Sequence, residues 1–82
     1  MKTLEEKFII LITELGPSLT AMDVEQIREL VDANELGVAF ENFCTQLYER
    51  DAVCSLDQLN QITSIGSAMG IGPEYWEHLA TS

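Results

Sequence analysis

The sequence predicts an all-α fold: a compact bundle of four helices plus a short C-terminal helix, in a single domain over residues 1–82. Three observations support this prediction. Apolar residues recur at spacings of three and four, which is the periodicity of amphipathic helices. No segment alternates between apolar and polar residues as a half-buried strand would. Hydrophobic residues make up 46% of the chain, which supplies one core and excludes an acidic disordered chain.

The first helix is expected to run from Leu4 to Leu15. Gly16-Pro17 closes it, because proline cannot continue a helix and glycine accepts a left-handed terminal conformation. Thr20 then begins the second helix, where Asp23 lies near the positive end of the helix dipole. The residues expected to be buried in this helix are Val24, Ile27, Leu30 and Val31.

Asn34 and Gly37 mark the interruption before a third helix, which should end near Arg50. Ser55 and Gln58 have the spacing of a capping box and predict the start of a fourth helix. The apolar side of the third helix carries Leu36, Phe40, Phe43, Cys44 and Leu47. The apolar side of the fourth carries Leu56, Leu59, Ile62, Ile65 and Met69.

Two glycines, Gly70 and Gly72, are expected to end the fourth helix. Pro73 suits the first turn of a last short helix over residues 74–79. Trp76 in that segment is expected to cover the core. The residues expected at the bundle centre are Phe40, Phe43, Leu47, Leu30, Leu59 and Ile62.

The charge is strongly acidic, with fourteen Asp and Glu against four Lys and Arg, for a formal net charge of −10. No Lys or Arg follows Arg50. Such a surface repels nucleic acid and anionic membranes and attracts basic partners. We therefore expect a protein-binding module, with no nucleic-acid, membrane or small-molecule partner.

Catalytic and metal sites are not expected. His78 is the only histidine, and the spacing of Cys44 and Cys54 fits neither a zinc site nor a redox pair. Both cysteines are predicted to be buried or half-buried free thiols. The segment from Asp32 to Gly37 resembles the opening of a calcium loop, but apolar residues occupy its later ligand positions. The sequence thus predicts no cofactor, no metal and no enzymatic activity.

Ser55 allows a second interpretation, because carrier proteins of this size attach a prosthetic arm to a serine at a helix start. The Asp of their Asp-Ser-Leu motif is replaced here by Cys54, and only 27 residues follow Ser55. An N-cap accounts for this serine better. The N-terminus carries two acids before a short apolar run, so it does not fit a signal peptide, and a cytoplasmic location is expected.

Two groups of carboxylates are candidates for partner binding. Glu25, Glu29 and Asp32 lie on one exposed stripe of the second helix, and Glu35 follows at the next turn. Arg28 is placed to pair with Asp32 within the helix. The second group flanks the segment before the fourth helix and consists of Asp51 and Asp57.

Three segments carry a resemblance to a known family: residues 36–49, residues 65–70 and residues 75–79. Together they resemble the MafI-type immunity proteins, which accompany secreted polymorphic toxins and contact-dependent growth inhibition (CdiI-like) systems of Gram-negative bacteria. The resemblance covers roughly residues 30–79, and its motifs determine fold more than function. It implies a cytoplasmic antitoxin that binds the C-terminal domain of a cognate toxin.

The charge points independently in the same direction. Several toxins of such systems are RNases, and a nuclease active site is basic because it holds phosphates. An acidic inhibitor can occupy that region with carboxylates. The alternatives are an acidic adaptor or regulatory module without a toxin and, with less support, the carrier protein.

Overall fold

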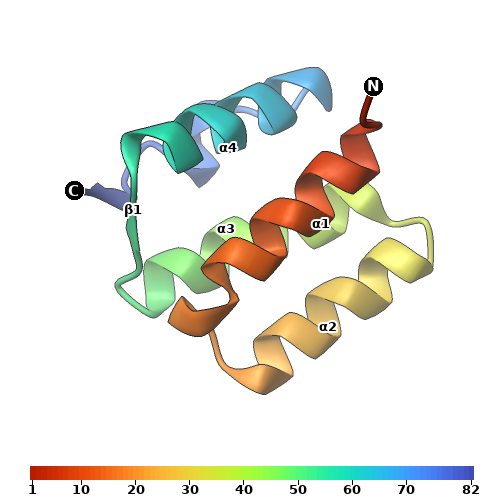
Figure 1. Cartoon of the computed structure of the whole chain (residues 1–82), viewed down its shortest axis with the longest axis horizontal. Helices are drawn as coiled ribbons and strands as arrows, with labels where there is room; N and C mark the ends of the chain where they lie inside the picture. Colours follow the sequence, from red (N-terminus) through yellow and green to blue (C-terminus); the bar gives the residue numbers. More distant parts are fainter.

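Four α-helices make up most of the chain (Figure 1). The computed structural model describes residues 1–82. The helices are α1 (Leu4–Leu15), α2 (Ala21–Asp32), α3 (Leu36–Glu49) and α4 (Leu56–Ala68). Their bounds confirm the four helices predicted from the apolar periodicity. None of them combines the length and the apolar character that crossing a lipid bilayer requires.

Three of these helices begin with a capping box, at Thr3, Thr20 and Ser55. In each box the hydroxyl oxygen accepts a hydrogen bond from the backbone N–H three residues later, and the side chain of that later residue accepts one in return. At α4, Ser55 Oγ lies 3.0 Å from the backbone N of Gln58, and Gln58 Oε1 lies 2.9 Å from the backbone N of Ser55. The predicted cap at Ser55 is confirmed.

The connections between helices follow the sequence prediction at two turns and depart from it at a third. Asn34, between α2 and α3, has a φ of 62°, and Gly70, after α4, has a φ of 72°. Gly16 was predicted to be left-handed, but its φ is −51° and the chain continues into a 3-10 turn, η1 (Gly16–Ser18). Pro17 is compatible with this turn, because the first turn of a helix leaves its N–H groups without intrahelical partners.

The helices pack around α1, which contacts each of the other three. In Figure 1 α2 and α4 lie on opposite sides of α1. α2 and α3 form the most extensive helix pair and run in opposite directions (Figure 1). A side-chain ion pair joins the start of α2 to the end of α3.

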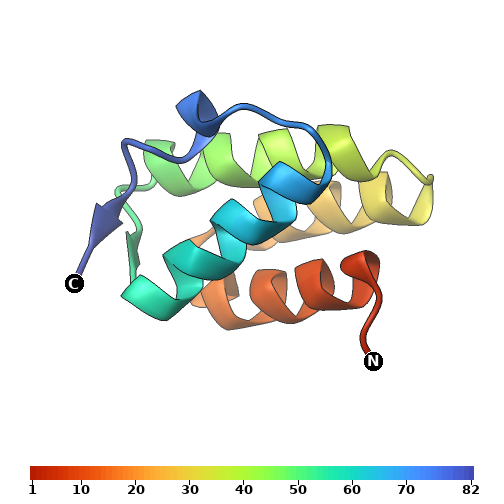
Figure 2. The same ribbon diagram turned by 90° about the horizontal axis from the view of Figure 1, so that it is seen from above.

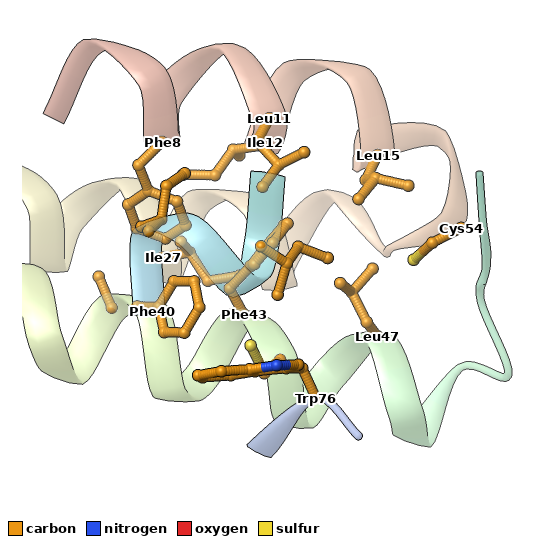
Figure 3. Close-up of a cluster of buried hydrophobic side chains, with 14 of the residues drawn as sticks. Phe8, Leu11, Ile12, Leu15, Ile27, Phe40, Phe43, Leu47, Cys54 and Trp76 are labelled. Carbon is orange, nitrogen blue, oxygen red and sulfur yellow. The ribbon is translucent and has the colours of Figure 1, made fainter. Parts of the chain in front are cut away.

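An aromatic cluster from α1 and α3 occupies the core (Figure 3). The Phe8 ring centroid lies 5.6 Å from that of Phe40 and 5.3 Å from that of Phe43, the latter pair edge to face. Such tilted and edge-to-face contacts are the favoured geometries of aromatic pairs. All three rings are fully buried, as are Leu47 and Ile62, which were also predicted for the centre.

The periphery of the core departs from the prediction at Val24 and at three leucines. Val24, expected to be buried, and Leu30 and Leu59, expected at the centre, are half-buried against its edge. Leu56 was expected on the apolar side of the fourth helix, but it is the first residue of α4 and is largely exposed. Cys44 and Cys54 are buried free thiols, as predicted.

The C-terminal segment does not form the predicted helix over residues 74–79. A 3-10 turn, η2 (Pro73–Tyr75), is followed by a short strand, β2 (Ala80–Thr81), which pairs in parallel with β1 (Val53–Cys54). A helix of six residues has little stability of its own, so tertiary contacts decide the path of such a segment. The chain at Trp76 has a φ of −130°, outside the helical region.

Trp76 is the contact that holds this segment in place. Its side chain is 5% exposed, and its ring centroid lies 5.8 Å from that of Phe40 in an edge-to-face arrangement (Figure 3). Gly66 of α4 lies directly against the Trp76 ring, where a larger residue would overlap it. The prediction that Trp76 covers the core is confirmed.

Candidate protein-binding surface

The carboxylates are distributed almost entirely over the surface. Twelve of the fourteen are exposed, Glu41 is half-buried, and only Asp23 is buried. Asp23 is also the only one with an Arg or Lys side chain within ion-pair distance. The surface therefore carries a large excess of negative charge that no cation of the chain neutralises.

Asp23 serves the fold and is unavailable to a partner. Its Oδ2 accepts hydrogen bonds from Arg50 Nε at 3.0 Å and from the Thr20 backbone N–H at 3.1 Å, and its Oδ1 accepts one from an Arg50 terminal nitrogen at 3.2 Å. The Arg50 hydrogen bonds, followed by the bond from Thr20, lower the pKa of Asp23 to about 2. The sequence had indicated only a favourable helix-end position for this residue, and its link to α3 was missed.

The predicted acidic stripe lies on α2 and at the turn after it. Glu25, Glu29 and Asp32 are exposed, on the side of α2 away from buried Ile27 and Val31. Glu35 is exposed at the N-cap position of α3 and makes no capping hydrogen bond there. We refer to Glu25, Glu29, Asp32 and Glu35 as the α2 stripe.

Arg28, the one cation of α2, does not neutralise this stripe. It is exposed, and no ion pair joins it to Asp32, although the sequence spacing allows one. All four carboxylates of the α2 stripe are therefore free to contact a partner.

Asp51 and Asp57, the second predicted group, have different surroundings. Asp51 follows α3 with a φ of 53° and lines a hollow together with Tyr48 and His78. Asp57 lies in the first turn of α4, where its Oδ2 accepts a hydrogen bond from Gln61 Nε2 at 2.8 Å. Asp57 does not line that hollow, so the structure does not bring the two residues together in one site.

The hollow beside Asp51 belongs to a groove that sequence reasoning missed. Two adjoining depressions, of about 260 and 80 Å³, run between the C-terminal half of α3 and the C-terminal segment. Their exposed polar and aromatic lining residues are Thr45, Tyr48, Asp51, Glu74, Tyr75 and His78. We refer to these six residues as the tyrosine groove. Apolar periodicity gives no signal for it, because two distant segments form it.

The two thiols are not activated. Burial, with smaller contributions from Cys54 and Glu41, raises the pKa of Cys44 to about 12, and burial also raises the pKa of Cys54. Thiols with raised pKa values are poor nucleophiles near neutral pH. His78 is exposed, and its Nε2 lies 3.4 Å from the neighbouring Glu77 carboxylate.

Neither the arrangement of possible metal ligands nor the comparison with known proteins indicates a further site. No group of three or more His, Cys, Asp or Glu side chains is placed to hold a metal ion. The hydroxyl of Ser55 is used in the cap of α4. The chain matches no protein-family model, no curated protein and no solved structure.

Proposed function

We propose that this protein is an immunity protein that binds and neutralises a cognate secreted toxin. The toxin would be of the polymorphic or contact-dependent inhibition type. Its C-terminal domain would be a basic nuclease, and we propose that this nuclease is an RNase. The inhibitor would act by stoichiometric binding in the cytoplasm, where such a nuclease finds its substrate. Catalysis by the inhibitor has no part in this proposal.

The observation that carries the proposal is the unneutralised surface charge. Twelve exposed carboxylates surround a core held by seventeen buried apolar residues, and none of the twelve has a Lys or Arg partner. A net charge of −10 on 82 residues exceeds the magnitude of about 2–8 that suffices for the solubility of a small domain. A nuclease cleft attracts phosphates with cations, so carboxylates displayed on a fixed scaffold can compete for the same cations.

The α2 stripe is the first surface proposed to contact the toxin. Three of its carboxylates, Glu25, Glu29 and Asp32, project from α2, which packs against both α1 and α3, so their spacing is held by the core. Glu35 follows at the start of α3. Preorganised charges lose less conformational entropy on binding than charges on a mobile loop. Asp51 and Asp57 are proposed as secondary contacts on other parts of the surface.

The proposal implies a toxin gene next to the gene of this protein, and co-purification with the product of that gene tests it. We expect a tagged form of this protein to capture that product in a defined stoichiometry and to abolish its RNA cleavage at equimolar concentration. The matched control is the Glu29→Lys/Asp32→Lys variant, which reverses two charges of the α2 stripe. Capture of basic proteins in general, with no inhibition of cleavage, would instead indicate an acidic adaptor.

A further inference from the structure

The tyrosine groove has features that the acidic surface as a whole does not explain. Tyr48 is 58% exposed and Tyr75 is 38% exposed, and both line the larger depression. Figure 2 shows the C-terminal segment running beside α3, which brings residues nearly thirty positions apart to one surface. Neither tyrosine takes part in the aromatic pairs of the core.

The groove is held firmly although its lining is exposed. Tyr75 directly precedes Trp76, which is buried against Phe40 and Gly66. Tyr48 follows buried Leu47 on α3. Each tyrosine is thus presented next to a residue anchored in the core. Exposed aromatic residues on a fixed backbone lose little entropy on binding and are frequent hot spots of interfaces.

The charges of the groove are one-sided. Asp51 and Glu74 line it together with His78, and no Lys or Arg does. A larger hollow of about 380 Å³ lies among residues of α1, α4 and the N-terminus, but Lys2 and Lys7, the only lysines of the chain, line it with a single carboxylate, Glu14. A cation is therefore favoured in the tyrosine groove, whereas two positive charges outnumber one carboxylate in the larger hollow.

From this arrangement we infer that the tyrosine groove receives arginine side chains of a basic protein partner. A guanidinium group stacks on the face of a tyrosine ring and at the same time donates two hydrogen bonds to a carboxylate. Lysine offers neither the planar stacking nor the paired donors. The inference rests on the proposed function in one respect, namely that the partner is basic, and it adds a second contact surface besides the α2 stripe.

A peptide titration tests the groove without the toxin. The ¹⁵N-labelled full chain is titrated with a blocked tetra-arginine peptide and, separately, with a blocked tetra-lysine peptide. We expect the largest shift changes at Tyr48, Tyr75 and their neighbours, and tighter binding of the arginine peptide. Tyr48→Ala should weaken arginine binding about two- to fivefold, the range of an exposed cation–π contact, whereas Tyr48→Phe should retain it. Tyr75→Ala provides a second, independent test of the same stacking.

The charge requirement is tested by two variants of equal net charge. Asp51→Asn/Glu74→Gln removes both carboxylates of the groove, and asparagine tolerates the positive φ of residue 51. Glu5→Gln/Glu14→Gln removes two exposed carboxylates on α1, outside the proposed contact surfaces. The groove variant should lose clearly more affinity for the arginine peptide. Equal losses, or shift changes spread over the whole surface, would overturn the inference, because attraction by the net charge would then suffice.

The captured toxin separates this inference from the proposed function. If the arginine peptide binds in the groove but no toxin is captured, the inference stands and the proposed function fails. If the toxin is captured and inhibited but Tyr48→Ala and Tyr75→Ala leave its Kd unchanged, the function stands and the groove is not its contact. Circular dichroism of each variant confirms that the fold is retained.

Discussion

The Asp23 carboxylate accepts two hydrogen bonds from the Arg50 guanidinium and one from the backbone of Thr20. Its side chain is 8% exposed, whereas that of Arg50 is 43% exposed. The ion pair therefore lies at the margin of the core, where it connects the first turn of α2 to the end of α3. In a chain with four cations, one of them is committed to the fold.

This pair predicts a specific pH dependence of stability. The pKa of Asp23 falls from an ordinary value of 3.8 to about 2 in the folded state, because Arg50 stabilises the ionised form. Its contribution is therefore complete above about pH 4 and is lost as the pH falls toward 2. We expect Asp23→Asn to be less stable than the native protein at pH 7, with the difference shrinking toward pH 2.

Urea unfolding at pH 7, 4 and 2.5 measures this difference. Only the difference between the two proteins is informative, because protonation also relieves repulsion among the other carboxylates. Glu29→Gln, which changes an exposed and unpaired carboxylate, is the control and should show little difference at any of these pH values. If the free energies of unfolding of Asp23→Asn and the native protein differed by the same amount at all three pH values, the shape of the side chain, and not its charge, would matter at this position.

The packing of Trp76 on α4 leaves no room for a methyl group at Gly66. Its Cα faces the Trp76 ring, and an added Cβ would overlap that ring and lie 3.1 Å from a Phe40 ring carbon. Gly66→Ala should therefore lower the free energy of unfolding by about 1–3 kcal/mol, the usual cost of overpacking, although alanine is the better helix former.

Gly37 provides the matched comparison. A Cβ at this position of α3 would meet no atom within 4 Å. Gly37→Ala should therefore raise the free energy of unfolding by up to about 1 kcal/mol. Thermal and urea denaturation of both variants measures the two changes, and equal effects at the two glycines would contradict the position assigned to Trp76.

At the scale of elements, α3 contributes the centre of the core. Phe43 is fully buried and packs edge to face on Phe8 of α1. Phe43→Ala should cost about 3–5 kcal/mol, a large part of the roughly 5–15 kcal/mol that stabilises a typical domain. Val38→Ala on the exposed side of the same helix should change stability by no more than about 0.5 kcal/mol. Urea denaturation followed by circular dichroism measures both, and a native-like midpoint for Phe43→Ala would place α3 in a different rotation.

The α2 stripe gives a prediction for binding. Glu29→Lys/Asp32→Lys should leave the fold intact, because both residues are exposed and lysine is favourable in the C-terminal part of a helix. We expect association with the toxin to slow roughly three- to tenfold, as the loss of steering charges predicts. Glu5→Lys/Glu14→Lys changes the net charge equally on α1 and is the control. Equal rates for the two variants, measured by surface plasmon resonance, would exclude the α2 stripe as a contact.

The sequence predicted an element correctly where the contacts that fix its conformation are between residues close together in the chain. The predicted capping box at Ser55 and the helix boundaries expected at Asn34 and Gly70 depend on residues within four positions, so the sequence could locate them. The capping boxes at Thr3 and Thr20 are equally local, although only the box at Ser55 was predicted. The C-terminal segment depends on Trp76 contacting Phe40 and Gly66. No periodicity within residues 74–79 could reveal that contact, so a helix was predicted where the chain forms a turn and a strand.

The candidate binding surfaces show the same difference between features set by local sequence and features set by distant contacts. Exposed carboxylates on one helix follow from helical spacing, and all six predicted ones are exposed. The tyrosine groove instead needs the end of α3 and the C-terminal segment to lie together. The sequence shows Tyr48 and Tyr75 only as separate residues and gives no sign of their common surface.

At the scale of the whole molecule, the net charge of −10 is spread over a body with a radius of gyration of 11.4 Å. A field from so many charges on a small body acts on an approaching basic partner before contact. The close contacts act later, when the α2 stripe or the tyrosine groove meets individual cations and loses its water. These two effects respond differently to salt, because screening weakens interactions across solvent more than interactions between desolvated groups.

The salt dependence of the binding kinetics therefore separates steering from close contact. The Debye length is about 8 Å at 0.15 M salt and about 3 Å at 1 M, so long-range attraction is largely screened at the higher concentration. We expect the association rate with the toxin to fall steeply, by about tenfold or more, between 0.05 and 1 M salt, and the dissociation rate to change much less. Stopped-flow mixing measures both rates, with Glu29→Lys/Asp32→Lys giving a shallower slope because it carries less charge. An association rate independent of salt would mean that the carboxylates serve solubility and that apolar or neutral polar contacts hold the toxin.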